Sequence, residues 1–143
     1  MVTDITLSLA IDSHSGRSLG LDIDANDQMI YSNQKFNNSN TIVKFQVALP
    51  CQLIFTISGR EENDTIIDSN GKILHDQSIH LTKVSLDGFD IDTWKIPPSH
   101  LFYNDHESSH FFWNRNGQAK LIIDESDPIL WILNHKTIVG VPE

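Results

Sequence analysis

Four oxygen-bearing side chains that could bind a cation follow one another in a segment rich in turn-forming residues. They are Asp64, Asp68, Asn70 and Asp76. Carboxylate and amide oxygens are the ligands that calcium takes, so calcium binding is one chemistry that this segment could support. An EF-hand alignment fails, because placing Gly71 on the loop glycine puts Ile66 at the first ligand position and Gln77 at the last. Asp and Asn are also typical of turns. We therefore expect turn residues and no required metal, with calcium possible.

Groups that could support catalysis are present, but their spacing is only weakly suggestive. Asp87, Asp90 and Asp92 could provide a carboxylate pair of the kind that glycosidases use. Cys51 has apolar neighbours, which disfavour the reactive thiolate. No nucleophile elbow, phosphate-binding loop or dinucleotide fingerprint occurs in the sequence. Three histidines lack the cysteine partners and the helical pattern of a zinc site, namely His100, His106 and His110. We expect no enzymatic activity.

Large aromatic side chains are the remaining candidates for contact with a ligand. Trp94 and Tyr103 lie in a polar segment with prolines, where a ring either closes one end of the fold or forms an exposed stacking surface for a sugar or a partner protein. Phe112 and Trp113 are adjacent, so on a strand one of the two should face outward. Trp131 belongs to an apolar run and is expected in the core. The candidate binding residues are thus Trp94, Tyr103 and Trp113.

The elements that must position these residues are β-strands. Apolar residues alternate with polar ones in most of the chain, which is typical of half-buried strands, and nowhere do they recur at helical spacing over three turns. We expect strands at 4–12, 19–24, 28–32, 41–49, 52–58, 65–68, 72–76, 78–86, 89–91, 111–113, 118–124 and 129–134. Segments 41–49 and 52–58 are the best candidates for central strands. Segments 33–40 and 94–109 are expected to be loops.

Short turn motifs predict which strands form hairpins. Asn-Gly and Asp-Gly supply the positive φ angles that tight hairpins require, and they occur at 70–71, 116–117 and 87–88. Residues 25–27, Ala-Asn-Asp, are a further predicted hairpin turn. Each of these positions is expected to join two antiparallel neighbours.

One strand is expected to contain an irregularity. In segment 78–86, Ile79 and Leu81 share one parity, whereas Val84 and Leu86 share the other. A strand that keeps its apolar residues on one face must therefore gain one residue near Thr82-Lys83, and a β-bulge does this.

These elements predict an all-β fold, an antiparallel two-sheet sandwich of jelly-roll or related topology, formed as one domain by residues 1–143. The formal net charge is -9, which disfavours binding to nucleic acid or to an anionic membrane. The single cysteine cannot form an internal disulfide. No export signal or membrane span is expected.

The order of core and turn residues in 41–134 resembles that of small β-sandwich proteins encoded by tailed bacteriophages, including phages of cyanobacteria. The matching residues are Phe45, Val47, Pro50, Phe55, Ile57, Ser58, Gly59, Asp64, Thr65, Asp68, Gly71, Ile73, Asp76, Ile79, Leu86, Asp87, Gly88, Asp90, Ile91, Asn114, Asn116, Gly117, Trp131, Ile132 and Leu133. Arg60 departs from the pattern, where lysine is expected more often. Segment 94–109 is not part of the resemblance.

The resemblance implies a fold like that of carbohydrate-binding modules and a virion component without enzymatic activity. We expect a structural or accessory protein of the phage particle that contacts other virion proteins and can form a homo-oligomer. The alternative is a carbohydrate-binding module that binds a host-surface glycan, with calcium dependence possible.

Overall fold

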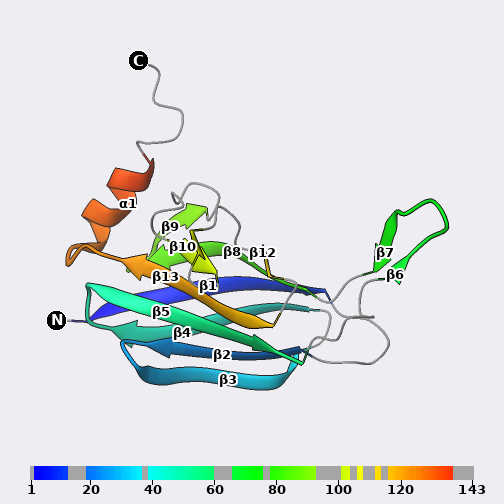
Figure 1. Ribbon diagram of the computed structural model, residues 1–143. Coiled ribbons are helices and arrows are strands. Elements are labelled where there is room, and N and C mark those ends of the chain that lie inside the picture. Colours follow the sequence, from blue (N-terminus) through cyan, green and yellow to red (C-terminus); the bar gives the residue numbers. More distant parts are fainter. Residues whose placement is uncertain are drawn as a thin grey trace, which may run out of the picture.

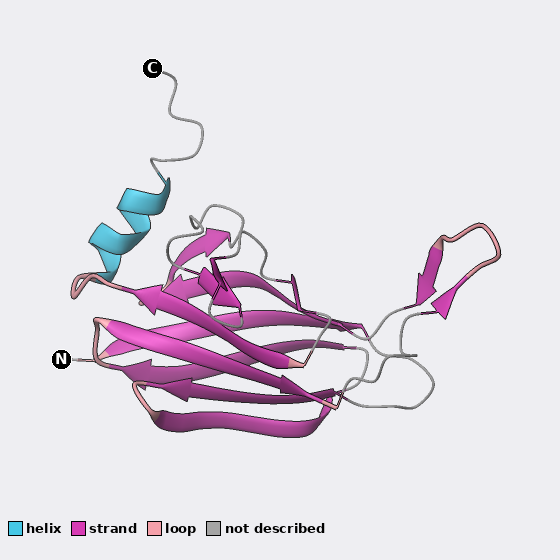
Figure 2. Ribbon diagram, in the orientation of Figure 1, coloured by secondary structure: helices cyan, strands magenta, loops and turns pink. Residues whose placement is uncertain are grey.

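The computed structural model describes residues 2–12, 19–36, 39–59, 66–75, 78–92, 101–103, 106–107, 112–113 and 116–136. Two antiparallel sheets contain most of these residues (Figures 1 and 2). The β1 sheet has the order β12-β8-β1-β4, with β9 paired to β8, and the β5 sheet has the order β11-β10-β13-β5-β2-β3. The prediction of an all-β, two-sheet antiparallel sandwich is confirmed.

The strands have the following bounds. The β1 sheet contains β1 (Thr3–Asp12), β4 (Ser39–Val47), β8 (Ser78–Leu86), β9 (Phe89–Asp92) and β12 (Phe112–Trp113). The β5 sheet contains β2 (Leu19–Ala25), β3 (Gln28–Phe36), β5 (Cys51–Ser58), β10 (Leu101–Tyr103), β11 (His106–Glu107) and β13 (Gly117–Ile123). A separate hairpin consists of β6 (Ile66–Ile67) and β7 (Ile73–His75).

The core is formed by the alternating apolar residues of both sheets. In β1 the buried set is Ile5, Leu7, Leu9 and Ile11, and in β5 it is Cys51, Leu53, Phe55 and Ile57. Full burial of such a side chain stabilises the fold by about 1.5–3 kcal/mol. A register slip of one residue would move the whole set of a strand to the outer face, so the alternation fixes which side chains face solvent.

The predicted bulge in β8 is present. Ser8 of β1 lies opposite Lys83 and Leu9 lies opposite Leu81, so Thr82 is the additional residue of β8 at the bulge. The Thr82 hydroxyl donates a hydrogen bond to the carbonyl oxygen of Ser8 at 3.1 Å. Ile79, Leu81, Val84 and Leu86 consequently all face the core.

Three of the four predicted hairpins are confirmed. Asn26 and Asp27 join β2 to β3, Asp87 and Gly88 join β8 to β9, and each of these four residues has a positive φ. The third hairpin joins β6 to β7 through residues 69–71.

The prediction of a hairpin at residues 116–117 is wrong. The strand before this turn, β12, pairs with β8, and the strand after it, β13, pairs with β5. The chain therefore passes from one sheet to the other at this point. Turn chemistry fixes the local φ angles, but it does not fix the neighbour that the next strand finds.

Two loop predictions also require correction. Segment 33–40 is largely strand, because β3 continues to Phe36 and β4 begins at Ser39. Backbone pairing with Leu21 and Ala10 holds Asn33 and Asn40 in the sheets despite their polar side chains. Segment 94–109 includes β10 and β11, and its other residues lie outside the described part.

The two strands expected at the centre occupy different positions. In the β5 sheet, β5 is central, as predicted, between β13 and β2. By contrast, β4 is the last strand of the β1 sheet, so the prediction for segment 41–49 is wrong. Alternation shows that one face of β4 is buried, but it says nothing about how many neighbours the strand has.

The final element is a helix, α1 (Pro128–Lys136), where a strand at 129–134 was expected. The Ile129 N–H donates to the Asp127 carboxylate at 2.9 Å, and the Trp131 N–H donates to the Asp127 carbonyl at 3.2 Å. Asp127 is thus an N-cap and Pro128 the first helical residue, a position that proline favours. Trp131 is buried, as expected. No helix among the described residues is long and apolar enough to cross a membrane.

Candidate functional site

The outward face of the β1 sheet contains an open depression with a volume of about 450 Å³. Its lining residues are Asp4, Ile5 and Thr6 of β1, Lys44, Phe45 and Gln46 of β4, and Gly88 of the β8–β9 turn. Asp4 lies opposite Gln46 and Thr6 lies opposite Lys44 in the register of the two strands. Two rows of polar side chains therefore border it, while Ile5 and Phe45 turn their side chains toward the core.

Hydrogen bonds hold one border of the depression in place. The Gln46 side-chain amide donates to the Asp4 carboxylate at 2.7 Å. The Asp4 N–H donates to the Asp87 carboxylate at 2.8 Å, and the Asp87 N–H donates back to the Asp4 carbonyl at 2.8 Å. The β8–β9 turn, which includes Gly88, is thereby fixed to the start of β1.

The β8–β9 hairpin carries an exposed ion pair. Lys83 and Asp90 lie 3.6 Å apart, with side chains 44% and 55% exposed. Pairs of this exposure contribute about 0–1 kcal/mol to stability. The ion pair therefore adds charged groups to the surface but contributes little to the stability of the fold.

The chemistry of the depression suits a neutral, polar ligand. It combines a carboxylate that accepts hydrogen bonds, an ammonium that donates them, and an amide and a hydroxyl that do both. The lining residues include no histidine and no cysteine, so they offer neither an imidazole base nor a thiol nucleophile. The arrangement fits reversible binding of a ligand that has donors and acceptors close together.

Among the described residues, no group of three or more His, Cys, Asp or Glu side chains lies together in a way that could hold a metal ion. One oxygen of Asp68 accepts the N–H groups of Asn70 at 2.8 Å and of Lys72 at 2.9 Å, so it shapes its own turn. Asp64 and Asp76 of the expected cluster lie outside the described residues.

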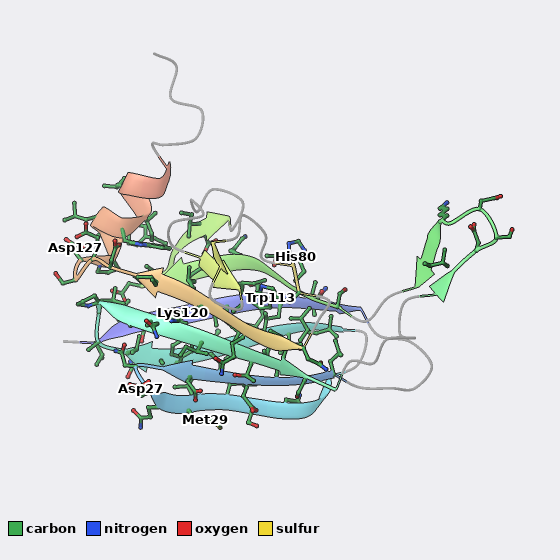
Figure 3. The ribbon with its side chains drawn as sticks, viewed as in Figure 1. Asp27, Met29, His80, Trp113, Lys120 and Asp127 are labelled. Carbon is green, nitrogen blue, oxygen red and sulfur yellow. The ribbon has the colours of Figure 1, made fainter. Side chains whose placement is uncertain are left out.

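Trp113 lies inside the sandwich and is not exposed (Figure 3). Its side chain is 1% exposed and packs on Phe55, with ring centroids 5.0 Å apart and an angle of 38° between the ring planes. The expectation that Trp113 offers a stacking surface is therefore corrected. The strand β12 has only two residues, Phe112 and Trp113, and such a strand is too short for its sequence to show which side chain faces inward.

The other two candidate aromatic residues give no described side-chain contact. Trp94 lies outside the described residues, as do His100 and His110. Tyr103 ends β10, and its backbone lies opposite Ala119 of β13. Its side chain is not among those described. The roles of Trp94 and Tyr103 in binding stay predictions.

Cys51 and the acidic residues of the β8–β9 hairpin can also be placed. Cys51 is buried, and burial raises the pKa of its thiol to about 11. This agrees with the unreactive thiol expected from its apolar neighbours. Asp87 and Asp90 are exposed, and a carboxylate oxygen of Asp87 accepts the Asp4 N–H.

Sequence reasoning did not single out the residues that border the depression. Asp4, Thr6, Lys44 and Gln46 are ordinary polar residues at outward positions of two strands. Their proximity depends on the pairing of β1 with β4, which are separated by two other strands in the chain. A usable signal would have been the register of this pair, which one sequence does not contain.

Comparison with known proteins adds a similarity of fold. No protein-family model matches the chain, and no curated protein matches it. A solved structure of vCBM60, described among calcium-dependent carbohydrate-binding modules, is similar with a TM-score of 0.53 and 6% identity over 84% of this chain and 90% of that chain. A structure of vCBM60 in complex with galactobiose is similar with a TM-score of 0.51 and 6% identity, over 83% of this chain and 97% of that chain. The chain thus has the sandwich fold of those modules.

Proposed function

We propose that this protein is a non-catalytic carbohydrate-binding domain. The observation that carries the proposal is the fold similarity over 84% of the chain to vCBM60, a carbohydrate-binding module. Galactobiose is bound in a second structure of that module. The alternative function expected from the sequence is thereby better supported than the virion role.

We place the glycan at the depression of the β1 sheet. Sugar hydroxyl groups donate and accept hydrogen bonds at once, and Asp4, Thr6, Lys44 and Gln46 provide both kinds of partner within one surface region. The depression is open, so a chain longer than its own width can extend beyond it. The net charge of -9 disfavours acidic polysaccharides and favours neutral ones.

Titration with neutral oligosaccharides tests both parts of this proposal. Galactobiose is the first probe, followed by other neutral disaccharides and their longer oligomers, with binding measured by calorimetry and by amide chemical shifts. Lys44→Ala and Gln46→Ala should each weaken binding about 5-fold, which corresponds to one hydrogen bond of about 1 kcal/mol. Lys120→Ala, on β13 of the other sheet, is the matched control and should leave the affinity unchanged (Figure 3).

Two outcomes would contradict the proposal in different ways. If the intact protein binds none of the glycans, the carbohydrate-binding function is wrong. If it binds a glycan equally well in the Lys44→Ala and Gln46→Ala variants, the function holds but the depression is not the site. Trp94→Ala then becomes the next variant, because Trp94 stays a candidate stacking residue.

The sequence resemblance supports a second role, as a structural or accessory protein of a tailed-phage virion. Glycan binding and virion assembly are compatible, because a virion protein can also bind a glycan of its host. Location in the particle stays a prediction from the resemblance. Mass spectrometry of purified virions tests it, and absence of the protein from the particles would exclude it.

A further inference from the structure

The strand β4 forms one margin of the β1 sheet, and its pairing with β1 is regular along its whole length. Nine consecutive pairs, from Thr3 opposite Val47 to Ile11 opposite Ser39, follow without a register shift. Among the described strands, β4 pairs with β1 alone. Its other side therefore presents an even row of backbone N–H and C=O groups, which is the pattern that another strand requires for pairing.

The corresponding margin of the β5 sheet is built differently. There, β3 pairs with β2 with register shifts between Leu19 and Leu21 and between Ile23 and Asp24. Such bulges twist a strand and interrupt the row of backbone groups, which hinders pairing with another molecule. Of these two margins, the one formed by β3 is thus irregular and the one formed by β4 is regular.

The side chains of β4 favour pairing with a second copy of the same strand. The sequence SNTIVKFQV contains one lysine and no acidic residue, although the chain has 19 acidic and 10 basic residues. Ile42 is 62% exposed at the middle of the strand. Lys44 forms no ion pair with a described residue. An acidic chain thus has a strand on which two identical copies meet without repulsion between carboxylates.

We infer that β4 pairs antiparallel with β4 of a second copy across a two-fold axis, so that two β1 sheets become one continuous sheet. A pairing centred on Val43 places Ile42 of each copy opposite Lys44 of the other. The aliphatic stem of a lysine can cover an exposed isoleucine while its ammonium stays in water. This contact occurs twice in the dimer, as two-fold symmetry requires.

The register keeps outward residues opposite outward residues. Asn40, Ile42, Lys44 and Gln46 have even numbers, and a pairing centred on Val43 matches even positions with even positions. Both depressions, which contain Lys44 and Gln46, then open on the same face of the joined sheet and adjoin across the axis.

Sedimentation of the full chain without glycan tests this dimer independently of the proposed function. Between about 1 and 500 µM, where weak interfaces dissociate, the protein should sediment as a reversible monomer–dimer mixture. Ile42→Lys places lysine opposite lysine and should weaken the dimer at least about 10-fold. Met29→Lys, at a residue 57% exposed on the irregular margin, is the matched control and should leave the dimer unchanged (Figure 3).

A charge exchange tests the register itself. Ile42→Glu should retain the dimer, because the new carboxylate lies opposite Lys44, and the double variant Ile42→Lys with Lys44→Glu should regain it. Circular dichroism confirms that each variant is folded. The inference is overturned if the intact protein is monomeric over the whole range, if Met29→Lys and Ile42→Lys act alike, or if the charge exchange fails to restore the dimer.

Discussion

Asp4 and Asp87 are joined by two hydrogen bonds that run in opposite directions. The Asp4 N–H donates to the Asp87 carboxylate, and the Asp87 N–H donates to the Asp4 carbonyl, both at 2.8 Å. The two residues are 83 positions apart in the chain. Their contact fixes the turn after β8 against the start of β1, and so fixes two borders of the depression relative to each other.

We expect Asp87→Ala to lower the free energy of unfolding by about 1–2 kcal/mol. The variant loses one hydrogen-bond acceptor, and alanine is less tolerant than Asp of the positive φ of 50° at this position. Asp87→Asn, which keeps an oxygen acceptor and suits a positive φ, should cost less. Urea denaturation followed by circular dichroism gives the values. Equal losses in the two variants would show that neither the acceptor nor the φ angle matters.

Trp113→Ala should destabilise the protein by about 3–5 kcal/mol, as expected for a large aromatic side chain in a core. Trp113→Phe should cost clearly less, because the indole N–H is buried and no described residue accepts a hydrogen bond from it. Chemical denaturation measures both effects. A folded Trp113→Ala variant of unchanged stability that no longer binds glycan would reinstate this residue as a binding surface.

Asp68→Ala should loosen the β6–β7 hairpin and leave the sandwich intact. Two backbone N–H groups lose their acceptor, so amide exchange at Asn70 and Lys72 should accelerate about 5-fold or more, at about 1 kcal/mol per hydrogen bond. The melting temperature should be the same with calcium and with a chelator. A rise of several degrees in millimolar calcium, lost in Asp68→Ala, would instead establish a metal role for this segment.

Stability should fall as the pH rises from about 9 to about 11 because of Cys51. Its pKa is raised from 9.0 to about 11 by burial. In that interval the unfolded chain has lost the thiol proton while the folded chain keeps it, so the unfolded state binds fewer protons and is favoured. Cys51→Ala removes this contribution, and the difference in unfolding free energy between the two proteins should therefore change across the interval. A constant difference would contradict the shift.

The strand pattern was accessible from the sequence because burial imposes a period of two. The parity change between Leu81 and Val84 predicts a bulge near Thr82-Lys83, and the register places it at Thr82. Burial produces the same alternation whichever strand is the neighbour. The sequence therefore could not predict that β4 lies at the margin of its sheet, or that the chain passes from one sheet to the other at Asn116. The depression depends on the pairing of β1 with β4 and was missed for that reason.

The helix α1 was missed for a different reason. Its run of Ile129 to Leu133 is apolar on all sides, with Trp131 and Ile132 buried and Leu130 exposed, so neither period stands out. The useful signal was the Asp127-Pro128 pair, since an N-cap residue followed by proline at the first position marks the start of a helix. This local signal predicts a helix that begins at Pro128, which the apolar run by itself does not.

The bulge at Thr82 also bears on which changes of chain length the fold can absorb. Removing Thr82 would make Leu81 and Lys83 adjacent, opposite Leu9 and Ser8, which are adjacent already. Every remaining side chain of β8 would keep its face, so this strand can become shorter by one residue and stay in register. The nine pairs between β1 and β4 are uninterrupted, so deletion of one residue in β1 would move the side chains on one side of the deletion to the opposite face of the sheet.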